Sequence, residues 1–257
     1  MPQPKKVDPR PVVAMPDRPD LPLSWAKFAP AIDAFVPPTG TFDPAGTWDM
    51  RWRILVTVGG MAGGAQPGTL RIQRQPGPSG TAKLAFETQV TLGGLQRFSM
   101  TGTLSCAPDA LTSVTTWEME STVQDIKGGP IESTRVRERG TATTDGAEID
   151  RAGKKFRLAA KPPLTSNWSL FDAVQRLSPD AAPGPFGMLE DLALLRHDQR
   201  ISPDETRVLS LGGKAMRLRS FVQIGDGILP THYWLDESGR LIFASCGLRG
   251  YMLDAAT

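Results

Sequence analysis

The densest group of side chains suited to chemistry lies near the C-terminus, where residues 231–236 read THYWLD. In an extended chain, alternate side chains point to opposite faces, so His232, Trp234 and Asp236 share one face and Tyr233 lies on the other. A histidine oriented by a carboxylate is what a general base requires. The alternative is a hydrogen-bonded histidine at a strand end. The candidate catalytic residues are His232, Tyr233, Asp236 and Arg249.

Aromatic residues supply a second kind of candidate site. The chain contains six tryptophans and ten phenylalanines, enough to line a cavity for an apolar ligand. Packing of the core would use the same residues equally well. The candidate ligand-binding residues are Trp52, Trp117, Trp168, Phe171, His232 and Trp234.

The sequence lacks the residue patterns of common metal, nucleophile and nucleotide sites. Two histidines and two cysteines in one chain do not supply a zinc site of four cysteines or three histidines. The sequence has no Gly-x-Ser-x-Gly elbow, no Gly-x-Gly-x-x-Gly and no phosphate-binding loop. We therefore expect no metal and no cofactor.

The amino-acid composition limits the kinds of partner that we expect. The 29 basic and 27 acidic residues are interspersed, so the chain has no basic surface of the kind that binds nucleic acid. Apolar runs stay shorter than the roughly 18 residues of a membrane-spanning helix, and we expect a protein that is not transmembrane. Cys106 and Cys246 suit two buried thiols or one bridge, with the bridge slightly favoured. A bridge predicts a periplasmic or secreted protein, although the first residues carry no signal peptide.

The elements that must position these residues are mostly strands. From Trp48 to Val58 apolar residues occupy the even positions, and the same period of two recurs along the chain between glycine-rich turns. One apolar and one polar face per strand predicts a mainly β fold. We expect a single domain over residues 45–257, a curved antiparallel sheet or half-open barrel of about ten strands.

Residues 165–196 depart from this period. Trp168, Phe171, Val174 and Leu177 recur at helical spacing, and Met188, Leu192 and Leu195 repeat the pattern. We predict two short inserted helices that cover the concave face or plug one mouth of the barrel.

Residues 1–44 form a separate region, since they hold 11 of the 23 prolines. We predict a proline-rich arm that is partly disordered. Residues 21–36 carry enough apolar side chains to dock on the body, and the arm is also a possible contact for a protein partner.

Two resemblances add to these patterns. Gly46, Thr47 and Trp48 resemble the Gly-x-Trp motif of lipocalins, whose tryptophan closes one end of a barrel. The segment from Gly227 to Pro230 and the hairpin from Tyr233 to Arg240 resemble the end of exported bacterial domains of unknown function. Those domains are similar to the lipoprotein carriers LolA and LolB. The resemblance implies a half-barrel covered by helices and no catalytic residues.

Three functions remain open. The first is an exported protein of unknown activity that binds an apolar or amphiphilic ligand in the concave face of the sheet. The second is a hydrolase or lyase with a polar site around His232. The third is a structural or partner-binding subunit that uses residues 1–44.

Overall fold

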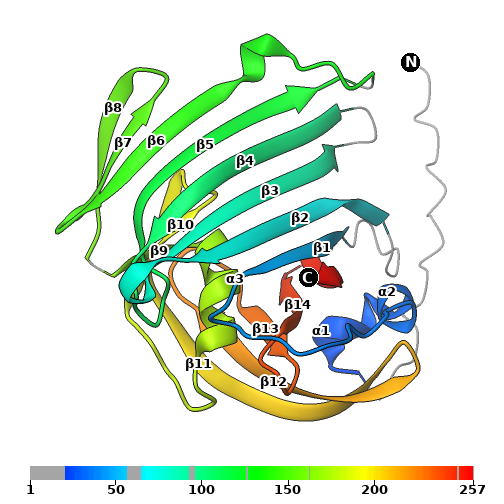
Figure 1. Ribbon diagram of the computed structural model, residues 1–257. Coiled ribbons are helices and arrows are strands. Elements are labelled where there is room, and N and C mark those ends of the chain that lie inside the picture. The colour runs from blue at the N-terminus through cyan, green and yellow to red at the C-terminus, as the bar shows by residue number, and fades with distance from the viewer. Residues whose placement is uncertain are drawn as a thin grey trace, which may run out of the picture.

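One curved sheet organises the molecule (Figure 1). The computed structural model describes residues 21–56, 65–92, 96–125, 127–161, 163–247 and 249–256. Within these ranges fifteen strands follow the order β8-β7-β6-β5-β4-β3-β2-β1-β15-β14-β13-β12-β11-β10-β9. The sheet is antiparallel except between β9 and β10. The predicted mainly β fold with an open, curved sheet is confirmed, with more strands than the ten expected.

The first half of the sheet is a simple meander in which each strand pairs with the next in sequence. Its strands are β1 (Trp48–Val56), β2 (Ala65–Pro76), β3 (Ala82–Leu92), β4 (Gln96–Cys106), β5 (Val114–Gln124), β6 (Val136–Thr143), β7 (Gly146–Arg151) and β8 (Lys154–Ala159). Two short 3-10 turns, Pro78–Gly80 and Glu132–Thr134, lie in its connections.

The second half joins the first through its last strand. Its strands are β9 (Leu164–Ser166), β10 (Phe186–Glu190), β11 (Leu194–Leu211), β12 (Lys214–Ile224), β13 (Thr231–Leu235), β14 (Leu241–Cys246) and β15 (Arg249–Ala256). β15 pairs with β1, so that Arg249 lies opposite Val56 and Ala256 opposite Met50. The two strands at the ends of the sheet order, β8 and β9, are consecutive in the chain. The barrel therefore has an open seam between β8 and β9.

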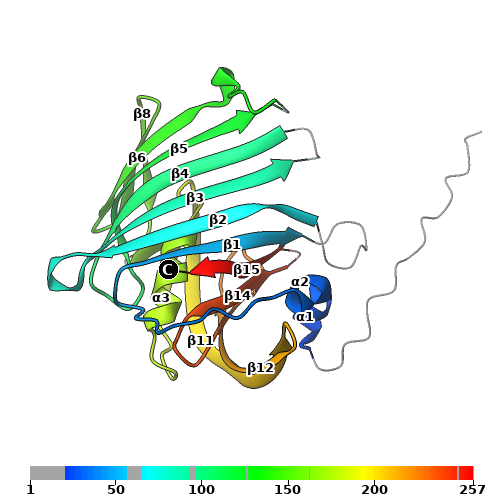
Figure 2. The ribbon, with the colours of Figure 1, turned by 45° about the vertical axis from the view of Figure 1, so that its right-hand side comes forward.

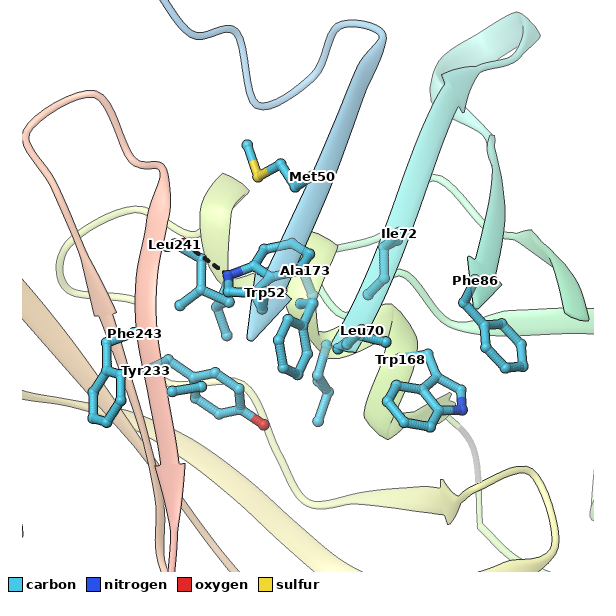
Figure 3. Packing of buried hydrophobic residues seen from close by; sticks show 14 of the residues in the cluster. Met50, Trp52, Leu70, Ile72, Phe86, Trp168, Ala173, Tyr233, Leu241 and Phe243 are labelled. Atoms are coloured by element: carbon cyan, nitrogen blue, oxygen red, sulfur yellow. Dashed lines mark hydrogen bonds between the residues drawn. The ribbon is translucent and has the colours of Figure 1, made fainter. Parts of the chain in front are cut away.

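The helix α3 (Asn167–Arg176) lies inside the curve of the sheet, and we call the face toward it the inner face (Figures 1 and 3). Ser166 caps the helix: its hydroxyl accepts from the Ser169 amide at 3.0 Å, and the Ser169 hydroxyl accepts from the Ser166 amide at 2.9 Å. Trp168 stacks on Phe86 of β3 with ring centroids 5.3 Å apart. The first predicted helix is thus present and covers the inner face.

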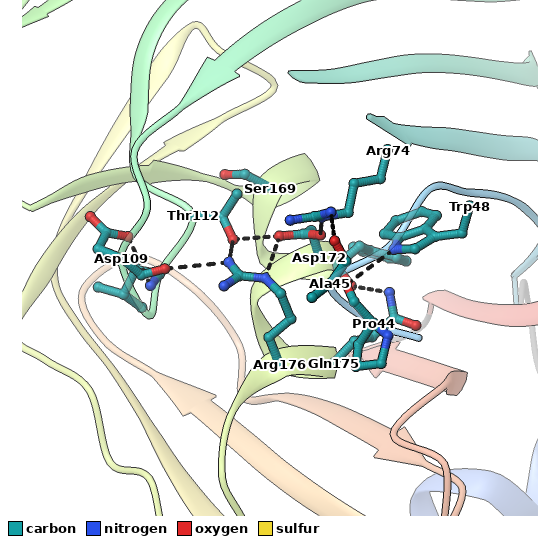
Figure 4. Close-up of polar contacts among 12 residues, drawn as sticks. Pro44, Ala45, Trp48, Arg74, Asp109, Thr112, Ser169, Asp172, Gln175 and Arg176 are labelled. Atoms are coloured by element: carbon teal, nitrogen blue, oxygen red, sulfur yellow. Dashed lines mark hydrogen bonds and ion pairs between the residues drawn. The ribbon is translucent and has the colours of Figure 1, made fainter. Parts of the chain in front are cut away.

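Buried polar contacts also hold α3 in place (Figure 4). The Asp172 carboxylate is 2.7 Å from Nε of Arg74 on β2, and it accepts from Nε of Arg176 at 3.0 Å and from the Thr112 hydroxyl at 2.6 Å. Both Asp172 and Arg74 are buried. Arg74 also donates to the carbonyl of Gly46 at 2.8 Å. One carboxylate therefore ties the helix to the sheet and to the loop before β5.

The second predicted helix, around residues 188–195, is wrong. Residues 186–190 form β10, and β11 begins at Leu194. β10 lies between β9 and β11 with Met188 and Leu189 both buried, so apolar side chains cover both of its faces. A short run of this kind imitates a helical stripe in the sequence. Asp191 and Leu192, with φ of +50° and +59°, turn the chain from β10 into β11.

The helices α1 (Leu23–Ala26) and α2 (Ala29–Asp33) pack against the outer face of the second half of the sheet (Figure 2). The Trp25 ring lies 5.1 Å from the Trp234 ring and 4.5 Å from the Phe243 ring, measured between centroids. The Gly212 amide, in the turn between β11 and β12, donates to the Ile32 carbonyl at 2.9 Å. Residues 21–36 are docked, as their apolar content indicates. Residues 1–20 of the predicted arm lie outside the described residues.

Candidate functional site

A cavity of about 330 Å³ opens on the inner face, between the start of α3 and strands β10 and β13–β15. Aromatic, apolar and polar side chains share its lining, as they do in most small-molecule sites. The lining comprises Asn167, Trp168, Phe171, Met188, Glu190, Asp191, Gln223, Gly227, Ile228, Leu229, Thr231, Tyr233, Cys246, Arg249 and Tyr251.

Rings from three elements form the aromatic wall of the cavity. Phe171 of α3 meets Tyr233 of β13 and Tyr251 of β15 edge to face, with centroids 6.2 Å and 5.3 Å apart. Trp52 of β1 packs edge to face on the same ring, with centroids 5.1 Å apart. Because Phe171 is held by three neighbouring rings, the wall is fixed before any ligand arrives.

A buried hydrogen-bond chain orients Tyr233. Its hydroxyl donates to Oε1 of Gln223 at 2.7 Å, and Nε2 of Gln223 donates to Oε1 of Gln199 at 3.0 Å. Burial raises the pKa of Tyr233 well above its usual range. Tyr233 therefore stays neutral and positions the wall, and it is not suited to act as a base at neutral pH.

The charged groups at the rim differ in whether they have partners. Glu190 pairs with Arg196 at 2.7 Å. Asp191 accepts from Nδ2 of Asn167 at 3.0 Å, and burial raises the pKa of its carboxyl. Arg249 is exposed and donates only to the Tyr251 hydroxyl, at a long 3.4 Å, with no ion pair among the described residues. The cavity thus has one cation that makes no ion pair among the described residues, and the Asp191 carboxylate acts on it electrostatically from a greater distance.

The mouth of the cavity carries an exposed apolar side chain and a thiol. Leu229 is 61% exposed, in the loop between β12 and β13. Cys246 is half-buried, and its thiol donates to the Leu229 carbonyl at 3.5 Å. Cys106 is buried on β4, and burial raises the pKa of its thiol. Both cysteines are free, and four strands separate β4 from β14 in the sheet, so the expected bridge is absent.

His232 lies away from the cavity, on the opposite face of β13 from Tyr233. Its Nδ1 is 3.2 Å from Oδ2 of Asp204 on β11, which also accepts from the Ser220 hydroxyl at 3.1 Å. The expected partner, Asp236, instead accepts from the Ser238 and Arg240 amides and closes the turn before β14. The prediction that Asp236 orients His232 is wrong because the strand ends at Leu235.

The structure divides the remaining sequence candidates between the cavity and the core. It brings Trp168, Phe171, Tyr233 and Arg249 together at the cavity. The other three candidate tryptophans are buried in the core and do not line the cavity. Trp52 donates to the Leu241 carbonyl at 3.1 Å, Trp117 donates to Glu138 at 3.1 Å, and Trp234 packs against Trp25 of the arm.

Sequence reasoning missed Tyr251, Asn167 and Asp191. Tyr251 had a usable signal, since it lies two residues after Arg249 on the same strand and therefore on the same face. Asn167 and Asp191 meet only through the fold.

Two larger hollows offer less for recognition. One of about 690 Å³ runs over the outer face of β2–β6, where several of its charged side chains pair with one another, as in Arg137 with Glu120 at 2.6 Å and Arg139 with Glu118 at 3.2 Å. The other, of about 530 Å³, lies at the seam near Lys161 and His197. The aromatic wall on the inner face makes the smaller cavity the stronger candidate.

Within the described ranges, no helix is both long and apolar enough to cross a membrane.

Comparison with known proteins supplies a fold and no activity. No protein-family model matches the sequence, and no curated protein matches it. Among solved structures, the chain is similar to a β-barrel-like protein from Brucella abortus, a domain of unknown function named DUF1849. The identity is 8% and the TM-score 0.51, and the match covers 82% of this chain and 97% of that one. At this identity the likeness establishes a β-barrel-like fold. The resemblances to lipocalins and to LolA and LolB stay predictions.

Proposed function

We propose that this protein binds a small apolar or amphiphilic molecule in the inner-face cavity. The observation that supports this most is the wall formed by Phe171, Tyr233 and Tyr251, which borders a cavity of about 330 Å³. Such rings offer a large apolar surface at little cost in conformational entropy.

The size of the cavity restricts the ligand. Ligand sites commonly enclose about 300–1,000 Å³, and about 330 Å³ is at the lower end. The occupant is therefore a compact molecule, or one end of a longer chain whose remainder leaves through the mouth. Leu229, exposed at that mouth, would be covered by such a remainder.

The arrangement favours binding over the alternative of a hydrolase or lyase. That alternative needs His232 to act with Tyr233, Asp236 or Arg249. Tyr233 is buried on the other face of the strand from His232, and Asp236 is engaged in a turn. Arg249 lines the cavity, away from His232.

Binding does not depend on where the protein resides. Export stays a prediction, and the free thiols of Cys106 and Cys246 remove the bridge that favoured it.

Cys246 provides a direct test, because a group attached to its sulfur would occupy the cavity. The binding assay is a titration with a solvatochromic medium-chain fatty-acid probe, which should give saturable fluorescence that an unlabelled fatty acid displaces. Alkylation of the native protein with N-benzylmaleimide should modify Cys246 and spare buried Cys106. We expect the alkylated protein to bind the probe at least tenfold more weakly.

The matched control is Cys246→Ser treated with the same reagent, which should bind the probe like the untreated protein. Unchanged affinity after complete alkylation of Cys246 would contradict the proposed location. No saturable signal with probes of several lipid classes would contradict the proposed function.

A further inference from the structure

We infer that the ligand carries a negatively charged group, of the carboxylate class, which Arg249 binds at the mouth of the cavity with help from Tyr251. This inference rests on the proposed function and names the ligand class of the same site.

The charged groups around the cavity differ in whether they are paired. Two carboxylates and one guanidinium line it. Glu190 is neutralised by Arg196 at 2.7 Å, and Asp191 is hydrogen-bonded to Asn167 at 3.0 Å with its carboxyl pKa raised by burial. Arg249 alone has no carboxylate within ion-pair distance among the described residues. The Asp191 carboxylate acts on Arg249 only from beyond ion-pair distance, so the guanidinium can still pair with an incoming anion.

Arg249 has hydrogen-bond donors available for a carboxylate. A guanidinium offers five N–H donors in a planar fork that matches the two oxygens of a carboxylate. Among the described residues, the side chain of Arg249 makes a single hydrogen bond, which joins its Nη1 to the Tyr251 hydroxyl at 3.4 Å, beyond the usual range. Most of its donors are free for a ligand, and the Tyr251 hydroxyl is a further donor beside them.

The backbone of Arg249 is held in the sheet. Arg249 lies opposite Val56 of β1 and Cys246 of β14, so strands on both sides fix its backbone. Arg249 and Tyr251 project to the same face of β15, as residues two apart on a strand do. The base of the arginine is thus held rigidly while its charged end stays in solvent.

The charge, the free donors and the position of Arg249 together define how the ligand would be oriented. Its apolar part would lie against Phe171 and Met188 inside the cavity, and its charged group would stay at the wet rim beside Arg249. A fully buried anion would lose its hydration, whereas one at the rim keeps part of it. A single-chain amphiphile with a terminal carboxylate meets both requirements.

The test compares ligands that share a chain and differ in the head group. Decanoate, decyl phosphate, 1-decanol and decylamine are titrated by calorimetry against the wild type and Arg249→Gln. We expect the wild type to bind decanoate more tightly than decanol and decylamine. Arg249→Gln should weaken decanoate by about tenfold to a hundredfold, the usual effect of losing a charge-assisted pair. Decanol affinity should be unchanged, which also shows that the variant is folded.

Two further variants separate the effect of the guanidinium shape from that of positive charge. Arg249→Lys keeps the charge without the fork, so decanoate should bind with intermediate affinity. Arg217→Gln removes the same charge from an exposed position on β12 and should change no affinity. The wild type could instead bind decyl phosphate more tightly than decanoate, with this preference lost in Arg249→Gln. That result would support an anionic ligand and change its class from carboxylate to phosphate.

The failures are distinguishable. Equal affinities for decanoate and decanol, with no effect of Arg249→Gln, would overturn the inference that the ligand is an anion. The proposed binding of an apolar molecule would not be affected by that result. Preferred binding of decylamine would likewise overturn the anionic ligand and point to Asp191. Absence of binding by all four compounds would overturn both this inference and the proposed function.

Discussion

The Asp172 carboxylate makes an ion pair with Arg74 and accepts hydrogen bonds from Arg176 and Thr112. Its side chain is inaccessible to solvent. Removing one member of a buried ion pair leaves the other charge without compensation. Asp172→Ala would leave the Arg74 guanidinium buried without its carboxylate partner. We therefore expect the free energy of unfolding to fall by about 3–5 kcal/mol. Urea denaturation followed by tryptophan fluorescence measures the change.

The matched comparison is Asp145→Ala, which removes a carboxylate from the surface pair with Arg157, both side chains being exposed. That change should cost about 0–1 kcal/mol because solvent screens the pair. Equal losses in the two variants would show that Asp172 does not have the structural role described.

Single residues were predictable from the sequence where strand or helix periodicity decides their face. Trp168 and Phe171 lie on the predicted side of a predicted helix and reach the cavity. The partner of His232 was not predictable in this way. Asp204 lies 28 residues earlier in the chain, and only the pairing of β11 with β12 and of β12 with β13 brings the two together. Periodicity carries no information about such pairing.

The short helices α1 and α2 depend on the sheet. Helices of four and five residues are unstable in isolation, so their packing on β13 and β14 must hold them. Replacing both Trp25 and Phe28 with alanine removes the rings that contact Trp234 and Phe243. We expect this double variant to release the segment 21–36 and to lower the melting temperature.

Limited proteolysis checks this prediction, because cleavage within residues 21–36 should become much faster in the double variant. Val36→Ala, at a position 82% exposed, is the control and should be cleaved like the wild type. Proteolysis at the wild-type rate in the double variant would mean that the two rings do not hold the arm.

Elements with one apolar face were the ones predictable from the sequence. β1 alternates clearly, and α3 has both an apolar stripe and a capping serine. β10 is covered on both faces, so its residues show no alternation and their spacing predicts a helix. Its identity as a strand follows from its neighbours β9 and β11, one of which is parallel to it.

At the scale of the whole molecule, an open sheet exposes the edge of β8. Lys154, Lys155 and Arg157 lie on this strand, and charges on an edge oppose pairing with another chain. Replacing Lys154 and Lys155 with valine should cause association, because an apolar β-branched edge accepts a second strand. Size-exclusion chromatography with light scattering measures the mass in solution.

The control is Lys83→Val on β3, which has paired strands on both sides and offers no free edge. That variant should elute like the wild type. A monomeric double variant at high concentration would show that the charges on β8 are not what keeps its edge free.

The curvature and openness of the sheet were predictable from repeated two-faced strands. The way in which its halves join was not, because β1 and β15 lie at distant places in the sequence. The open seam follows from that same join, since it leaves β8 and β9 as the two edges.

The pairing of β1 with β15 also sets an order for synthesis. β1 to β8 are a meander of neighbouring contacts, which form quickly because the loops to be closed are short. β1 must nevertheless wait with one edge unpaired until β15, the latest of the described strands, leaves the ribosome. Until then the central strand of the described sheet is an exposed edge, and a nascent chain in that state is a natural client for a chaperone.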